Sequence, residues 1–267
     1  MNPEKGEVLA FNKPYRWTSF NVVAKVRREL SGRIGVKKLK VGHAGTLDPL
    51  ATGVLLVCTG KATKRIDELQ AHTKEYVATI KLGATTPSFD METAEDATYP
   101  TEHITREMVE ETLKKFVGSI EQVPPVFSAC KVDGKRAFKL ARQGEEVELK
   151  AKTLVIDEIE LMSFGMVKND AAHEAEERSS ADGRDQRINY QSDNLGDEHL
   201  SMTIRVVCSK GTYIRALARD IGQALGSGAY LTDLIRTRIG EYSLKDCIDI
   251  EELDEWLDRQ SFENNEK

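Results

Sequence analysis

The spacing of apolar residues along the chain predicts amphipathic helices. In residues 18–30 the apolar positions recur at helical spacing, and Thr18 or Ser19 is suited to cap the helix. The buried face of this helix would comprise Val22, Val23, Val26 and Leu30. Residues 105–118 show the same period behind a candidate cap, Thr105. A further helix is expected near residue 214, with the buried face Ile214, Leu217, Ala218, Ile221 and Leu225.

Other segments have the alternation or the continuous apolar run that is typical of β-strands. Residues 53–60 form an apolar run that ends in glycine, and residues 154–164 and 201–211 also indicate strands. Residues 75–83 alternate, and one face of this strand would hold Tyr76, Ala78, Ile80 and Leu82. Strands and helices do not alternate regularly, so we expect an α+β fold with a largely antiparallel, mixed sheet flanked by helices.

Residues 123–144 are predicted to contain a hairpin and a short helix. The pair Asp133-Gly134 is a turn signal between two extended stretches. The short helix would begin at Ala137 and end near Gly144.

Charge is distributed unevenly along the chain, whose overall net charge is −6. Residues 168–199 carry a net charge of −5 and few apolar side chains, which predicts a flexible acidic insertion between two strands. Residues 249–267 carry a net charge of −6. Residues 13–41 hold nine lysines or arginines and one acid. This basic segment is either the footprint of a polyanionic partner or a solvated helix face.

Composition excludes several classes of protein. With 40% hydrophobic and 31% charged residues, the chain is expected to be soluble and globular. It contains no apolar run long enough for a membrane span and no cleavage signal near its start, so we expect a cytoplasmic protein. The 4 cysteines lack CxxC spacing and the 5 histidines do not cluster, which argues against a zinc site or a disulfide framework. Cys58 and Cys208 lie in apolar runs and are expected to be buried.

Asp48 is the one carboxylate within residues 42–55, GHAGTLDPLATGVL. Pro49 restricts Asp48 to extended backbone geometry, and the glycines allow tight turns and the close approach of a ligand. The residues alone leave two interpretations open. Asp48 either builds a turn or is a reactive carboxylate presented in a cleft.

Residues 53–63, GVLLVCTGKAT, do not form a phosphate-binding P-loop. Six residues separate the two glycines where the Walker pattern needs four, and alanine follows the lysine. The cations Lys61, Lys64 and Arg65 therefore either hold phosphates as a simple basic patch or mark a structural strand exit.

Several segments resemble the TruB family of pseudouridine synthases, beginning with the Asp48 loop, which is similar to the catalytic motif of that family. The other segments occur in family order and are NKPYRWTSF, KEYVATIKLGATTPSFD, VPPVFSACKVDGKRAFKLAR, CSKGTYIRALARDIG and AYLTDLIRTRIGEYSL. The resemblance implies the pseudouridine synthase catalytic fold with RNA-binding insertions, and no cofactor or metal. The implied reaction is isomerisation of the uridine at position 55 in the T-loop of tRNA. The base is flipped out, detached from C1′, turned and rejoined through C5.

The resemblance also assigns catalytic residues. Asp48 matches the catalytic aspartate, and both a covalent adduct at C1′ and an elimination to a glycal are open. Arg215 matches the arginine placed beside that aspartate, although a surface arginine in a first helical turn is the alternative. Tyr76 matches the active-site tyrosine, which would stack on the base and accept the C5 proton. As an alternative, Tyr76 is a core tyrosine.

Substrate contacts follow from the same resemblance. His43, Tyr213 and Leu234 match positions that contact the flipped nucleotide or line its pocket, although from the residues alone they would be structural. The candidates for the RNA backbone are Lys13, Arg16, Lys61, Lys64 and Arg65. Lys13 also belongs to a motif that shapes the pocket, and Arg16 stands where many relatives have glycine.

The expected domain organisation is a catalytic domain over residues 1–248, interrupted by the insertion 168–199. Residues 249–267 would form a short acidic tail, too short for the PUA domain that bacterial relatives often carry. Contact with the acceptor stem of tRNA is therefore expected to be reduced.

The expected partner is the T-stem-loop of tRNA, and the expected state is a monomer. Two alternatives stay open: an RNA-binding or tRNA-folding module whose catalysis is dispensable, and a synthase that acts on a different RNA uridine.

Overall fold

A computed structural model describes residues 1–128, 130–132, 134–141, 143, 147–168 and 198–263. The predicted insertion lies outside the described residues except at its two ends, Lys168 and Glu198–His199, which belong to strands. The described residues form two compact units. The first unit comprises residues 1–75 and 235–263, and the second comprises residues 76–168 and 198–234.

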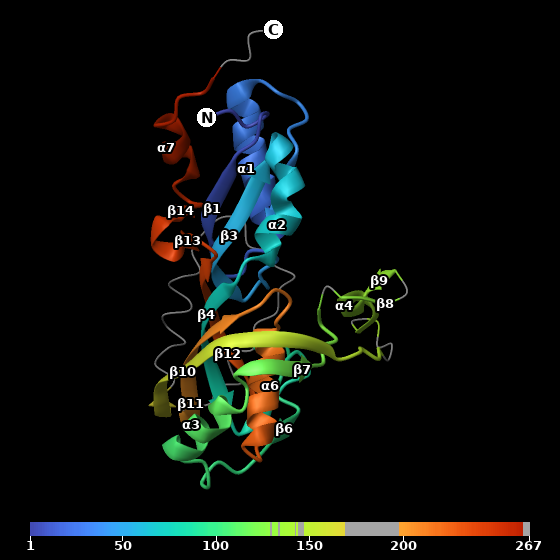
Figure 1. Ribbon diagram of the computed structural model, residues 1–267, viewed down its shortest axis with the longest axis vertical. Helices are drawn as coiled ribbons and strands as arrows, with labels where there is room; N and C mark the ends of the chain where they lie inside the picture. The colour runs from blue at the N-terminus through green and yellow to red at the C-terminus, as the bar shows by residue number, and fades with distance from the viewer. Residues whose placement is uncertain (129, 133, 142, 144–146, 169–197, 264–267) are drawn as a thin grey trace. The chain divides into compact units, whose positions relative to one another are not determined.

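The first unit is a sheet with helices packed against it (Figure 1). Its strand order is β14-β1-β3-β12, with β2 beside β3 and β13 beside β12. The strands are β1 (Val8–Lys13), β2 (Val41–Ala44), β3 (Ala51–Thr59), β12 (Ala229–Ile239), β13 (Tyr242–Ser243) and β14 (Ile248–Asp249). The helices are α1 (Ser19–Ile34), η1 (Gly60–Arg65), α2 (Ile66–Ala71), η3 (Leu244–Asp246) and α7 (Leu253–Asp258). The pair β1–β14 is parallel, and β1–β3 and β2–β3 are antiparallel.

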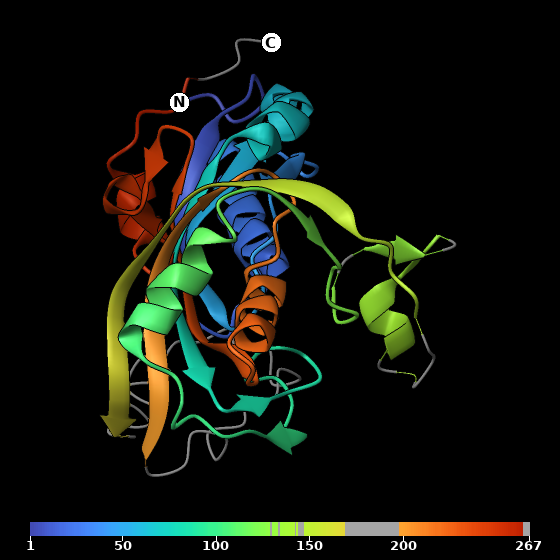
Figure 2. The ribbon, with the colours of Figure 1, turned by 60° about the horizontal axis from the view of Figure 1, so that its bottom comes forward.

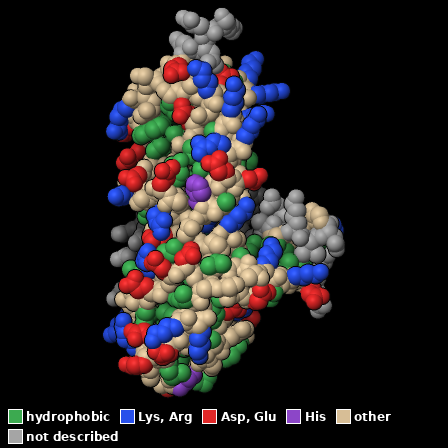
Figure 3. All heavy atoms as spheres, in the orientation of Figure 1, with side chains coloured by type: hydrophobic (Ala, Val, Ile, Leu, Met, Phe, Trp, Pro, Cys, Tyr) green, Lys and Arg blue, Asp and Glu red, His purple; other side chains and the backbone are tan. Residues whose placement is uncertain are grey.

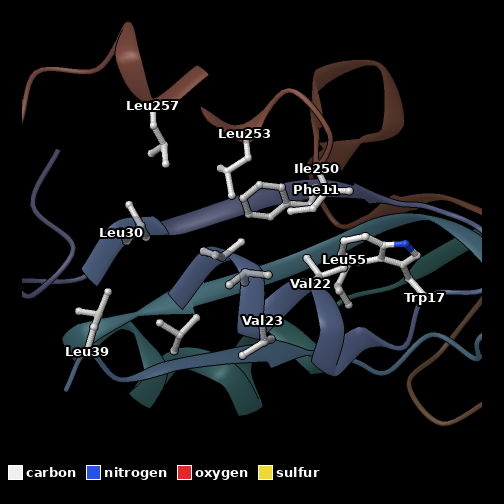
Figure 4. Close-up of a cluster of buried hydrophobic side chains, with 13 residues drawn as sticks. Phe11, Trp17, Val22, Val23, Leu30, Leu39, Leu55, Ile250, Leu253 and Leu257 are labelled. Carbon is white, nitrogen blue, oxygen red and sulfur yellow. The ribbon is translucent and has the colours of Figure 1, made fainter. Parts of the chain in front are cut away.

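Helix α1 confirms the prediction from apolar spacing. Thr18 caps it in a capping box with Asn21, and the predicted positions Val22, Val23, Val26 and Leu30 are all buried. The last turn ends at Gly35, whose φ of 69° is the left-handed geometry that favours glycine. The buried face of α1 packs on Phe11 and Leu55 of the sheet (Figure 4).

The acidic C-terminal residues also contribute to this core, which the charge count did not anticipate. Ile250, Leu253 and Leu257 are fully buried in the same cluster as Phe11 and Trp17 (Figure 4). Burying a leucine side chain contributes about 1.5–3 kcal/mol. Residues 249–258 are therefore packed structure, with their acids on the outer side of α7.

The second unit is built around the strands β12-β4-β11-β10-β7, and β4 and β12 carry the chain from one unit into the other. Its strands are β4 (Lys74–Leu82), β7 (Gly118–Gln122), β10 (Lys152–Lys168) and β11 (Glu198–Cys208), with the short hairpins β5 (Ala84–Thr85)–β6 (Ala97–Thr98) and β8 (Lys131–Val132)–β9 (Lys135–Arg136). Its helices are α3 (Arg106–Lys114), α4 (Ala137–Ala141) and α6 (Ile214–Ala224). The pairs β10–β11 and β10–β7 are antiparallel, and α3 packs on β10 beside α6 (Figure 2). The α+β class and the largely antiparallel sheet are confirmed.

In strand β4, alternation predicts one buried face correctly, but a lysine on the other face is buried as well. Tyr76, Ala78, Ile80 and Leu82 are buried as predicted. Lys81, on the opposite face of the strand, is also buried, and its ammonium forms an ion pair with Glu95 at 2.8 Å. The segment after β4 therefore contributes a polar partner to this strand.

Candidate active site

Asp48 lies in the loop between β2 and β3 of the first unit and is half-buried. Gly45 has a φ of 89° and Gly53 a φ of 100°, which are left-handed geometries that glycine adopts without strain. A Cβ on Gly53 would also lie 2.3 Å from the backbone oxygen of Arg236. The amide of Ala51 donates to the carbonyl of Asp48 at 3.1 Å, so the loop turns tightly at the carboxylate. The glycine pattern therefore fixes where Asp48 is presented.

Lys13 supports this loop from inside the protein. Its side chain is 0% exposed, and its ammonium donates to the carbonyls of Pro14, Trp17 and Pro49 at 2.9, 2.6 and 3.3 Å. The last of these carbonyls follows Asp48 directly. The sequence predicts Lys13 as a candidate for contact with the RNA backbone. Because its ammonium is enclosed by protein carbonyls, we assign it to loop support instead.

Burial also changes the acidity of Lys13. Desolvation lowers its pKa from 10.5 to about 7, the charge of Asp48 opposes this shift, and the charge of Arg236 adds to it. Asp48 and Arg236 are therefore both within electrostatic reach of Lys13.

The pKa of Lys13 predicts a pH dependence of stability. Between pH 7 and 10.5 the unfolded chain binds more protons than the folded chain, so the free energy of unfolding should rise with pH. The slope should reach up to about 1.4 kcal/mol per pH unit. Burial raises the pKa of Cys58 and Cys247 to about 11, which works in the opposite direction above pH 9. The effect of Lys13 on the free energy of unfolding is therefore best measured between pH 7 and 9, below the range in which the two cysteines oppose it.

Urea unfolding across that window tests the assignment. The native chain should gain stability with pH, and Lys13→Met should show a flatter dependence. Equal slopes in the two proteins would mean that Lys13 does not titrate near pH 7.

Arg236 and Ser19 are two further supports of the loop. Arg236 was not among the candidate residues, and Ser19 was a candidate helix cap, a position that Thr18 takes instead. Arg236 is 1% exposed and donates to the carbonyls of Gly45 and Val54 at 3.0 and 2.7 Å. The hydroxyl of Ser19 donates to the carbonyl of Leu47 at 3.1 Å and accepts from its amide at 2.9 Å. The sequence shows a serine at the expected start of the first helix and an arginine within the segment that forms β12. Neither residue by itself identifies the group that it contacts.

Arg16 adopts an unusual backbone geometry beside the same loop. Its φ is 63°, and its amide donates to the carbonyl of Pro49 at 2.9 Å. The left-handed geometry costs a non-glycine residue about 1–2 kcal/mol. Glycine would adopt it without this cost. The side chain of Arg16 is half-buried, and its contact with RNA stays a prediction.

The remaining predicted residues of the first unit lie on β2 and η1. His43 is half-buried on β2, opposite Val57 of β3. Lys61 and Lys64 are exposed on η1, where they are available to phosphates, whereas Arg65 forms an ion pair with Glu68 at 3.0 Å. Figure 3 shows lysine and arginine side chains over the surface that α1 and α2 form.

The second unit holds the other predicted residues, among them Arg215. Arg215 lies in the first turn of α6 and is 4% exposed, so the surface alternative is wrong. Its guanidinium is 3.6 Å from the carboxylate of Asp90 and donates to the carbonyls of Ser88 and Phe127 at 3.1 and 2.9 Å. Asp90, which is 6% exposed, is an ionic partner that the sequence analysis missed. The pairing joins residues 125 positions apart, and no local pattern signals it.

Tyr76, Tyr213 and Leu234 belong to the same unit. Tyr76 on β4 is 7% exposed, and Leu234 on β12 is 9% exposed. The backbone of Tyr213 is held by the side-chain amide of Gln122, which accepts from its N–H at 2.9 Å and donates to its carbonyl at 3.2 Å. Its hydroxyl is 3.1 Å from the sulfur of Cys130. Tyr213 is thus held at its backbone and at its hydroxyl.

Two further observations concern the described residues as a whole. They contain no group of three or more His, Cys, Asp or Glu side chains placed to hold a metal ion. None of the helices in the described part of the chain is long and apolar enough to cross a membrane.

Comparison with known proteins gives consistent matches over the chain. Residues 32–214 match the model of the TruB family pseudouridylate synthase N-terminal domain, and residues 215–266 match that of the tRNA pseudouridylate synthase B C-terminal domain. The chain is 64% identical to tRNA pseudouridine synthase B of Bacteroides thetaiotaomicron, over 100% of this chain and 99% of that protein. It is 61% identical to the protein of the same name from Phocaeicola vulgatus, over 98% of each.

A solved structure supports the same fold. The chain is similar to a chain in the crystal structure of a Cbf5–Nop10–Gar1 complex, with a TM-score of 0.61 and 26% identity. The match covers 96% of this chain and 56% of the solved one.

Proposed function

Because the chain belongs to the TruB family of pseudouridine synthases, we propose that it isomerises the uridine at position 55 in the T-loop of tRNA. That it is a pseudouridine synthase acting on tRNA follows from the family and from its high identity to relatives of that activity. The choice of the T-loop uridine rests on the motifs around Asp48 and Arg215. The observation that carries the proposal is the half-buried Asp48 carboxylate, which lies in a glycine-shaped loop within electrostatic reach of the buried Lys13.

The proposed chemistry begins at the glycosidic bond of the flipped uridine. Flipping costs a few kcal/mol, which stacking and backbone contacts offset. The anionic carboxylate of Asp48 then promotes cleavage of the C1′–N1 bond, by attack at C1′ or by elimination to a glycal. The detached base turns, C5 bonds to C1′, and Asp48 is released as the carboxylate. The atoms of substrate and product are the same, so no co-reactant is required.

Loss of the C5 proton is the step that we assign to Tyr76. The ring lies on the buried face of β4, where it is suited to stack on an extruded base. We expect Tyr76→Phe to keep the stacking surface and to lower the isomerisation rate by about 10²–10⁴-fold, the usual contribution of a general base. Tritium release from RNA labelled at uridine C5 measures this step directly. A rate for the Tyr76→Phe variant close to that of the native chain would exclude Tyr76 as the proton acceptor.

We assign RNA binding to further residues in each of the two units. Lys61 and Lys64 are exposed cations suited to phosphates, and His43, Tyr213 and Leu234 would contact the extruded nucleotide. Recognition of a folded RNA loop by shape, stacking and phosphate contacts is the general mode for RNA.

A transcript experiment tests the position. The purified chain is incubated with a full-length tRNA transcript and with a matched transcript carrying cytidine at position 55, and pseudouridine is mapped by chemical modification. We expect product at position 55 of the first transcript and none in the second. Product at another uridine would show a different target, and bound RNA without product would favour a binding module.

A further inference from the structure

Arg236 is a buried arginine. The hydrogen bonds described for its guanidinium go to backbone carbonyls and include no carboxylate. Its side chain is 1% exposed, and it is the largest among the fully buried side chains of the described residues. Its hydrogen bonds within the described part of the chain go to two carbonyl oxygens, those of Val54 and Gly45. Burying a guanidinium is costly unless it is well satisfied, so its place in the core calls for a physical reason.

The two acceptors of Arg236 flank the Asp48 loop, one at its first residue and one within the strand that follows it. Gly45 follows β2 directly, and Val54 lies near the start of β3. Nε donates to Val54 at 2.7 Å, while Nη2 donates to Gly45 at 3.0 Å. One planar side chain therefore ties the start of the loop to the strand that follows it. The backbone of Arg236 also closes on Gly53, where no Cβ would fit.

The charge of Arg236 acts on the same loop. Both Asp48 and Arg236 influence the ionisation of Lys13, so the three groups share one electrostatic environment. Lys13 loses its proton near neutral pH, whereas an arginine stays charged. Arg236 therefore supplies a permanent positive charge within electrostatic reach of Lys13, the other buried support of the loop.

We propose that Arg236 is a positioning residue for the isomerisation, which ties the start of the Asp48 loop to the strand that follows it so that the carboxylate meets the extruded uridine. The proposal rests on the proposed role of Asp48. It goes beyond that role by assigning the geometry of the nucleophile to a buried residue about 190 positions away in the chain.

Steady-state and single-turnover kinetics of Arg236→Met and Arg236→Lys test this inference. The methionine removes the donors and the charge, and we expect kcat per folded molecule to fall by about 10²-fold, the usual loss for a misplacement of about 1 Å. The KM for tRNA should stay within about twofold, because Arg236 is enclosed and does not reach RNA. The lysine restores a charge and a donor and should recover about tenfold of the loss.

The matched control is Arg238→Met, two residues further along β12. Arg238 donates to Gly240 and Glu75 and not to the Asp48 loop. Its kcat should remain within about threefold of the native value. If Arg236→Met folds poorly, Ser19→Ala provides a second test, because it releases Leu47 of the same loop and should also lower kcat with KM unchanged.

The activity of the native chain separates a failure of the proposed function from a failure of the positioning role. If the native chain makes no pseudouridine at position 55, the proposed function is wrong. If the native chain is active and the folded fraction of Arg236→Met, or Ser19→Ala in its place, keeps the native kcat, the positioning role is overturned. A loss of kcat equal to that of Arg238→Met would also overturn it.

Discussion

Replacing Asp48 with asparagine is expected to abolish pseudouridine formation while RNA binding is retained. Asparagine has nearly the same shape as aspartate but cannot act as an anionic nucleophile. By comparison with other removed nucleophiles, the rate should fall by at least about 10⁴-fold. The loop itself should survive, because it is held through its backbone by Lys13, Arg236 and Ser19.

Product formation and RNA affinity should therefore be measured on the same preparation of Asp48→Asn. A matched control is Asp67→Asn, an exposed carboxylate in the first turn of α2, for which we expect the native rate. Loss of RNA binding together with activity would show that Asp48 builds the loop. Native activity in Asp48→Asn would remove it from the chemistry altogether.

Replacing Arg215 with methionine is expected to cost both stability and activity. The guanidinium and its partner Asp90 are buried, with side-chain exposures of 4% and 9%. Removing one member of a buried ion pair leaves the other charge unpaired, which costs about 3–5 kcal/mol. Urea unfolding followed by circular dichroism should show a loss of that size.

The double variant Arg215→Met with Asp90→Asn separates the two effects. Because the unpaired carboxylate is gone, part of the stability should return relative to Arg215→Met alone. Activity should not return, because the resemblance assigns Arg215 to catalysis. Recovery of activity with stability would show that Arg215 acts only in folding.

Local periodicity predicted the apolar part of the buried faces of two helices. The cap at Thr18 and the stripe of α1 follow from helix spacing, and the buried face of α6 follows in the same way. Thr105 caps α3 as expected, although the helix ends at Lys114 and Gly118 begins β7. The hairpin β8–β9 was also expected, although its Asp133 lies outside the described residues.

Buried charges account for what local patterns missed. Lys13, Lys81 and Arg236 look like surface residues in sequence, but they are buried because distant carbonyls or carboxylates satisfy them. In α7 the acids dominate the composition, so a tail was expected. The spacing of Leu253 and Leu257, four residues apart, was the available signal for a buried face.

Part of the candidate site could be predicted from the sequence, and the part that depends on distant contacts could not. The glycines and Pro49 allow a tight loop at Asp48, but the residues left its role open until the family resemblance was considered. The partners Asp90, Gln122 and Arg236 were missed, because each contact joins segments roughly 90 to 190 residues apart. Such contacts depend on the tertiary fold, which no window of sequence contains.

The most direct test of the central claim is a map of pseudouridine across total cellular RNA, with and without the gene for this chain. We predict that the T-loop signal at position 55 of tRNA disappears on deletion. It should return with the native chain and stay absent with Asp48→Asn expressed at the same level. Persistence of the position-55 signal after deletion, or its return with Asp48→Asn, would contradict the proposed function.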